Sequence, residues 1–131
     1  DMLESIKVAL CSQRHNACMP NVGWCEVTDM LFRNNAKMAE RTGFPTLGVL
    51  KPGAAADVIV MDYKPFTPFS DANIDGHMLF GMTGRQCQTT MINGKILMKD
   101  RVLTEIDEEA VNARILESSK RLWGRLNHRE Y

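Results

Sequence analysis

Hydrophobic residues recur at helical spacing through the first third of the chain. This pattern predicts a helix over residues 1–13, a loop over 14–22 and a second helix over 24–32. A short third helix is expected to begin at Asn35 as its N-cap, after an interruption at Asn34-Asn35, and to end at Gly43. The residues expected to face inward are Met2, Leu3, Ile6, Ala9 and Leu10 in the first helix, and Trp24, Val27, Met30 and Leu31 in the second.

After Gly43 the pattern changes to short extended segments separated by proline and glycine. The run Val58-Ile59-Val60-Met61 is mostly β-branched and is bounded by polar residues, which predicts a buried strand over 57–63. Pro52-Gly53 predicts a turn before this strand, because proline fixes φ and glycine supplies a positive φ. Asp57 is expected to cap that turn.

A second extended region contains a strong hairpin signal. Residues 87–92 and 95–98 alternate in polarity on either side of Asn93-Gly94, a dipeptide typical of the type I′ turn. Before this hairpin, residues 70–76 are expected to form a loop and residues 77–80 a short apolar run.

The last segment is expected to be an amphipathic helix that begins at Asp107 as its N-cap. Glu108 and Glu109 favour this start, because acidic side chains are stabilised in the first turn of a helix. Its apolar stripe is interpreted as core contact. That stripe comprises Val111, Ile115, Ser118, Leu122 and Leu126, with Trp123 beside them.

Composition limits the classes of function. Hydrophobic residues make up 44% of the 131 residues, which is enough for a packed core, and 16 basic residues balance 16 acidic ones. This neutral balance argues against a nucleic-acid groove or an anionic membrane surface as partner. A local basic cluster near the end is interpreted as the solvated face of a helix: Lys120, Arg121, Arg125, His128 and Arg129. Four scattered cysteines are typical of a reducing, cytoplasmic compartment.

Residues able to do chemistry are sparse. The three histidines, His15, His77 and His128, are more than fifty residues apart, so no local pair of metal ligands can form. His77 lies in an apolar run and is interpreted as a satisfied core histidine rather than a catalyst. Cys11, Cys18, Cys25 and Cys87 show no recognised zinc or redox spacing, although a cysteine-centred site stays open as an alternative. No residue of this chain is assigned a catalytic, cofactor-binding or metal-binding role.

Three segments together carry a resemblance to the amidohydrolase superfamily. Residues 47–57 followed by Val-Ile-Val resemble the signature that begins the C-terminal sandwich strand, and residues 91–97 resemble the hairpin placed about thirty residues later. Residues 29–36 resemble the helical segment before the signature. Finer likeness to the guanine deaminase, cytosine deaminase and chlorohydrolase branch lies in residues 1–5, in 77–81 and in Leu122-Trp123.

The resemblance implies an α+β fold. Residues 1–43 would be the terminal helices of a (β/α)8 barrel, 44–103 strands of a small β-sandwich and 104–131 a C-terminal helix. In such enzymes one divalent metal ion, zinc or iron, activates water at the C-terminal ends of the barrel strands. Asp1 lacks the context of the family's metal-binding aspartate and is not expected to be a ligand.

Two hypotheses about function therefore stay open. In the first, the chain is the C-terminal portion of a metal-dependent amidohydrolase that deaminates a small heterocycle. Its catalytic residues, barrel and first sandwich strands would then lie upstream, and the enzyme could form a homo-oligomer. In the second, the chain is a non-catalytic structural or assembly module derived from such an enzyme. The first hypothesis predicts exposed apolar surface on the strand at 57–63 and on the stripe of the helix at 1–13.

Overall fold

The first helix is longer than its hydrophobic stripe predicts. The computed structural model describes residues 1–128, and α1 spans Met2–Ala17 instead of ending at residue 13. The carboxylate of Asp1 caps its first turn by accepting hydrogen bonds from the amides of Leu3 and Glu4. Residues 14–17 add a polar last turn, in which Arg14 and His15 lie at the end of the helix where cationic side chains are favoured.

The next helical region is continuous where an interruption was expected. α2 (Trp24–Asp29) runs through a π-helical segment, η1 (Met30–Asn34), into α3 (Asn35–Arg41). Asn35 has helical dihedral angles and no side-chain cap joins it to α3, so its prediction as an N-cap is wrong. The π segment ends at Asn34 and α3 begins at Asn35, so the helix passes through the asparagine pair without a break. The inward placement of Met30 is also wrong, because its side chain is 56% exposed.

Gly43 ends this region as predicted. Its φ of 86° is left-handed, its amide bonds the carbonyl of Glu40, and the amide of Phe44 bonds the carbonyl of Ala39. These two bonds form a Schellman motif, which satisfies carbonyls that the helix leaves unpaired.

The strands form one antiparallel sheet of order β1-β2-β3-β4. Their bounds are β1 Val58–Met61, β2 Cys87–Ile92, β3 Lys95–Lys99 and β4 Val102–Leu103. The predicted turn between β2 and β3 is confirmed, since Asn93 and Gly94 have φ of 47° and 79°. A second turn of this kind, at Asp100 and Arg101, leads to β4, which the sequence analysis did not anticipate.

The turn before β1 also forms as predicted, with one difference. Gly53 has a φ of 84°, and the amide of Ala54 bonds the carbonyl of Lys51 across the turn. Asp57 does not cap this turn. Its carboxylate accepts a hydrogen bond of 2.6 Å from the amide of Asn93, so it fastens the start of β1 to the tip of the β2–β3 hairpin.

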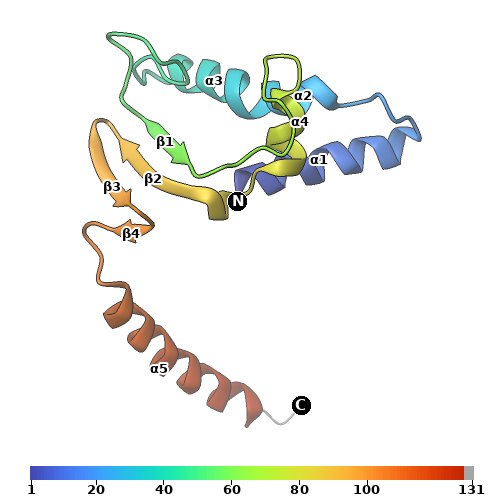
Figure 1. The fold of residues 1–131 in the computed structure, drawn as a ribbon. Coiled ribbons are helices and arrows are strands. Elements are labelled where there is room, and N and C mark those ends of the chain that lie inside the picture. The colour runs from blue at the N-terminus through green and yellow to red at the C-terminus, as the bar shows by residue number, and fades with distance from the viewer. Residues whose placement is uncertain (129–131) are drawn as a thin grey trace.

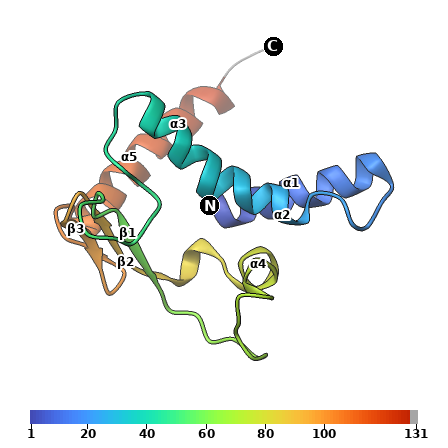
Figure 2. The same ribbon diagram turned by 90° about the horizontal axis from the view of Figure 1, so that it is seen from above.

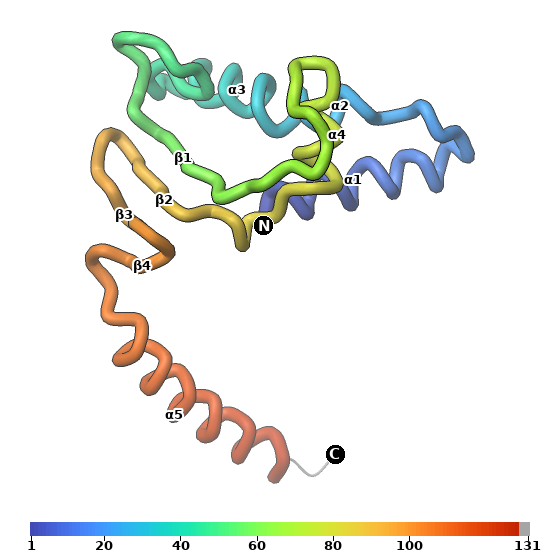
Figure 3. The backbone as a smooth tube through the Cα atoms, in the orientation of Figure 1, coloured from blue at the N-terminus to red at the C-terminus, as the bar shows by residue number. Residues whose placement is uncertain are grey.

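The connection between β1 and β2 contains a helix where a loop and an extended run were expected. α4 (Ile74–Gly76) continues into a second π-helical segment, η2 (His77–Gly81), and a 3-10 turn, η3 (Gly84–Gln86), precedes β2. The tube in Figure 3 shows this connection leaving the sheet and passing beside α1. The run at 77–80 turns helical because it buries Leu79 in the helical core.

The buried core is small and lies among the helices. Ile6 and Leu10 of α1 pack with Val27 of α2 and Leu79 of η2. Figure 2 shows the sheet at one end of this helical part. The expectation that the stripe of the first helix is exposed is therefore wrong for Ile6 and Leu10.

Exposure at the strand agrees with the sequence analysis in part. Ile59 and Val60 of β1 are 57% and 47% exposed, whereas Val58 and Met61 are partly buried. Consecutive residues of a strand point to opposite faces, so Ile59 and Val60 leave part of each face of β1 available to packing partners.

The last helix, α5 (Glu108–Asn127), begins at the predicted cap, where the carboxylate of Asp107 accepts from the amide of Ala110. Figure 1 shows α5 extending away from the sheet and the other helices. No residue of α5 is buried, so its apolar stripe is not the core contact that was expected within the described residues. Arg129 and the other residues of the predicted 104–131 segment beyond 128 lie outside the described residues. Among residues 1–128, no helix has the length and apolar character that a membrane crossing demands.

Candidate functional site

His77 is the most enclosed titratable side chain that the sequence analysis singled out. It lies at the start of η2, is 8% exposed, and touches the rings of Tyr63 and Phe69 in edge-to-face geometry. Nδ1 is 2.5 Å from the hydroxyl oxygen of Tyr63, and Nε2 is 3.2 Å from the hydroxyl oxygen of Thr67. Both ring nitrogens therefore have partners.

This pairing limits what His77 can do chemically. A neutral imidazole has one donor and one acceptor, and each hydroxyl can serve either role, so both tautomers are satisfied. Both nitrogens contact hydroxyl groups of this chain, so a bound molecule or metal ion would have to displace Tyr63 or Thr67 to reach them. The interpretation of His77 as a satisfied histidine is confirmed by these contacts.

A shallow hollow of about 270 Å³ adjoins His77. Its wall includes Phe66, which is 88% exposed, and Gly81, which lies directly against the hydroxyl of Tyr63. A methyl group at position 81 would overlap that hydroxyl. The hollow is open and aromatic, and His77 is its one described histidine, already paired.

Asp1 joins two distant parts of the chain. One carboxylate oxygen caps α1, and the other accepts a hydrogen bond of 2.7 Å from the amide of Gly84. A Cβ at position 84 would lie 2.9 Å from the carboxylate, so the close approach depends on glycine. Both carboxylate oxygens of Asp1 thus accept from backbone amides, and that Asp1 is not a metal ligand stays a prediction.

The cysteines lie apart from any metal-binding arrangement. Cys11, Cys18 and Cys25 are exposed, Cys87 is partly buried, and all four are free thiols. Within residues 1–128, no group of three or more histidine, cysteine, aspartate or glutamate side chains is close enough to hold a metal ion. The donor set that the structure describes therefore does not fit the ion that the resemblance implies.

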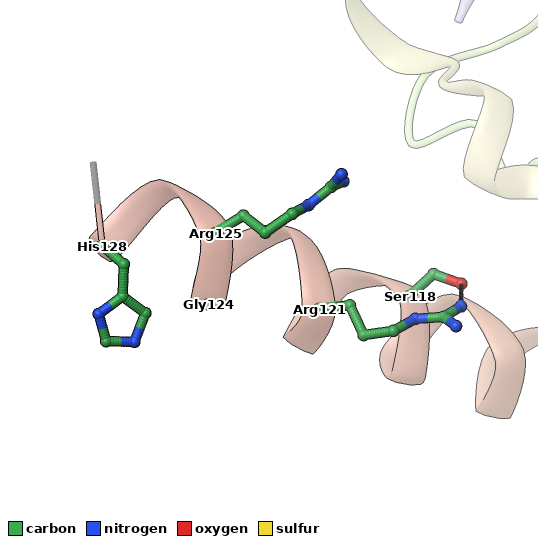
Figure 4. A pocket seen from close by; sticks show the side chains of 5 residues that line it. All are labelled: Ser118, Arg121, Gly124, Arg125 and His128. Carbon is green, nitrogen blue, oxygen red and sulfur yellow. Dashed lines mark hydrogen bonds between the residues drawn. The ribbon is translucent and has the colours of Figure 1, made fainter.

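The basic cluster of α5 borders a wide, open hollow on one side of the helix. Its lining comes from Ser118, Arg121, Gly124, Arg125 and His128. Figure 4 shows that Arg121 turns to Ser118, at 3.2 Å, while Arg125 and His128 point to different sides of the helix. Because these side chains diverge and come from one helix alone, they do not form an enclosed binding site.

Comparison with known proteins supplies what the geometry lacks. The chain is 30% identical over 133 residues to the 5′-deoxyadenosine deaminase of Methanosarcina mazei, covering 97% of the chain and 29% of that protein. It is 35% identical over 96 residues to the 5-methylthioadenosine/S-adenosylhomocysteine deaminase of Halothermothrix orenii, covering 72% of the chain and 22% of that protein. No family model matches the chain.

The fold has a counterpart among solved structures. A crystal structure of a triazine hydrolase variant matches this chain with a TM-score of 0.63 and 23% sequence identity. The match covers 86% of this chain and 25% of the triazine hydrolase chain. This match supports the α+β class and says nothing of activity. The chain spans less than a third of the length of each of these three proteins. By sequence, it is related to deaminases of the amidohydrolase superfamily over a C-terminal portion.

Proposed function

We propose that this chain is the C-terminal portion of a metal-dependent amidohydrolase that acts on C–N bonds other than peptide bonds. The observation that carries the proposal is the similarity to a deaminase along 97% of the chain, although the chain spans only 29% of that enzyme. The catalytic residues would belong to the remaining portion, upstream of Asp1. Absence of a metal-binding cluster in residues 1–128 is compatible with this division.

The substrate we propose is a small heterocycle that carries an amino group. Both named deaminases have substrates whose names contain adenosine, a nucleoside with an exocyclic amine on its purine ring. Hydrolytic deamination replaces that amine with oxygen and releases ammonia. We also propose that the complete enzyme belongs to the guanine deaminase and chlorohydrolase branch of the superfamily.

One divalent ion, zinc or iron, is proposed for the complete enzyme. When bound, such an ion supplies an activated water at neutral pH. Residues 1–128 do not fit it, so the ligands would come from the upstream portion. The role left to this chain is to pack against the catalytic portion and hold it in shape. A cytoplasmic location and homo-oligomer formation stay predictions.

The first test is the intact mass of the protein made from its natural reading frame. Under the proposal it exceeds 14.8 kDa by at least a barrel, about 250 residues, and the purified protein contains metal. It should then release ammonia from adenosine-type nucleosides, measured with a coupled ammonia assay and checked after chelation. A mass of 14.8 kDa would favour the alternative, a non-catalytic assembly module.

A further inference from the structure

The apolar stripe of α5 is a large surface without a partner in the described residues. Its apolar side chains are between 40% and 59% exposed: Val111, Ile115, Leu122, Trp123 and Leu126. Val111, Ile115 and Leu122 line an open hollow together with Arg114, Ser118 and Ser119. Burying such residues would be strongly favourable, so this face is built to be covered.

The segment that leads into α5 is tied to β3. The hydroxyl of Thr104 donates to the carbonyls of Ile96 and Leu97, at 2.9 and 3.1 Å. The backbone amide of Thr104 also donates to the carbonyl of Leu97. Lys95 and Glu105 form a salt bridge of 2.5 Å beside it. These bonds tie the connection to β3, and beyond it α5 extends away from α1–α4 (Figure 1). The helical part of this chain is therefore not what covers the stripe.

Basic side chains line one side of the stripe. Arg114 borders the hollow with Val111 and Ile115, and Arg121 and Arg125 follow at helical spacing. Within the described residues, none of these three arginines forms a salt bridge with an acidic side chain. A surface that fits this face is therefore apolar along its centre and acidic along one margin.

A second copy of α5 fits this pattern poorly. An antiparallel pair about a two-fold axis brings the same side of both helices together, so the arginine rows would lie along each other and repel. A parallel pair that buries Ile115 and Leu126 would also bury Glu108 and Ser119 on the same face, each against the same residue of the second helix. Coiled coils need apolar residues at such positions. Neither arrangement buries the stripe without a mismatch.

The length of the relatives points to another occupant. The 5′-deoxyadenosine deaminase match covers 97% of this chain, yet about 70% of that protein lies outside the match. We infer that α5 docks on the upstream portion of its own enzyme. In this arrangement, α5 would cover an apolar groove on the catalytic part, and acidic side chains along one margin of that groove would face the arginines. This inference rests on the proposed function, since it needs that portion to exist.

The test is hydrogen exchange of the α5 amides, followed by mass spectrometry, in two proteins. One is the chain of residues 1–131, and the other is the product of the complete natural reading frame. The expected result is exchange at least tenfold slower over residues 108–127 in the longer protein. Ile115→Asp should return this exchange to the rate in the short chain. Ala113→Asp, which adds the same charge on the opposite side of the helix, should leave it slow.

Each outcome separates the inference from the proposed function. A longer protein that deaminates its substrate while α5 exchanges as fast as in the short chain overturns the docking alone. Slow exchange that becomes fast on dilution to the monomer also overturns it, because a second copy would then cover the stripe. A natural product of 14.8 kDa overturns the proposed function and removes the occupant with it.

Discussion

At the scale of single residues, the side chains of Tyr63, Thr67 and His77 form one hydrogen-bonded group. The apolar neighbours of His77 favoured a satisfied histidine, and the contacts with Tyr63 and Thr67 confirm this. Neither partner could be named from the sequence. Both depend on the path of a long connection and on the π-helical segment that carries His77.

Gly81→Ala should destabilise the chain by roughly 1–3 kcal/mol, because a methyl group there overlaps the hydroxyl of Tyr63 and would displace it from His77. The free energy of unfolding from urea denaturation measures this change. Gly124→Ala is the matched control, since nothing lies within 4 Å of its added methyl and alanine favours a helix. Equal stability of Gly81→Ala and the unmodified chain would contradict the described geometry.

Asp1→Ala should cost about 1–2 kcal/mol, because it removes the cap of α1 together with the bond to the amide of Gly84. Gly84→Ala should also destabilise the chain, since its methyl would lie 2.9 Å from the same carboxylate. Combined in one chain, the two changes should cost less than their sum, by 0.5 kcal/mol or more. Strict additivity in urea denaturation would mean that the two residues do not touch.

At the scale of elements, local signals succeeded where a turn or cap determines the structure. Asn93-Gly94, Gly43 and Asp107 each demand a particular backbone geometry, and each produced the expected turn or helix end. Elements whose form depends on distant packing could not be predicted. The helix that carries Leu79 forms where the residues of the core meet, and the turn at Asp100-Arg101 lacks a glycine to signal it.

Gly94→Ala should weaken the hairpin by roughly 1–2 kcal/mol, because a residue with a side chain is strained at φ 79° even in open space. Hydrogen exchange of the β2 and β3 amides measures the loss, and exchange in α1 serves as an internal reference. Gly76→Ala is the matched substitution outside the hairpin, since position 76 has a helical φ of −62°. Unchanged exchange in β2 would show that this turn does not hold the hairpin.

At the scale of the molecule, fold class was within reach of the sequence and the site was not. The signature before β1 and the hairpin at Asn93 indicated the superfamily, and the structure brings them together through the bond from the amide of Asn93 to Asp57. Catalytic chemistry could not be predicted, because the described residues contain no metal-binding cluster and the chain spans a minor part of its relatives. What the chain does display is surface prepared for packing.

That surface gives the last prediction. Among residues 1–128, the buried core has four hydrophobic residues, whereas Ile59 and Val60 of β1 and the stripe of α5 stay exposed. The chain of residues 1–131 should therefore bind a hydrophobic dye such as ANS and self-associate at micromolar concentration. Ile59→Thr together with Ile115→Asp should lower both the dye fluorescence and the mass measured by light scattering, while Ala113→Asp alone should lower neither. A monomeric chain that does not raise the fluorescence of the dye would mean that these faces need no partner. The exposed apolar surface would then no longer support an upstream portion that packs against this chain.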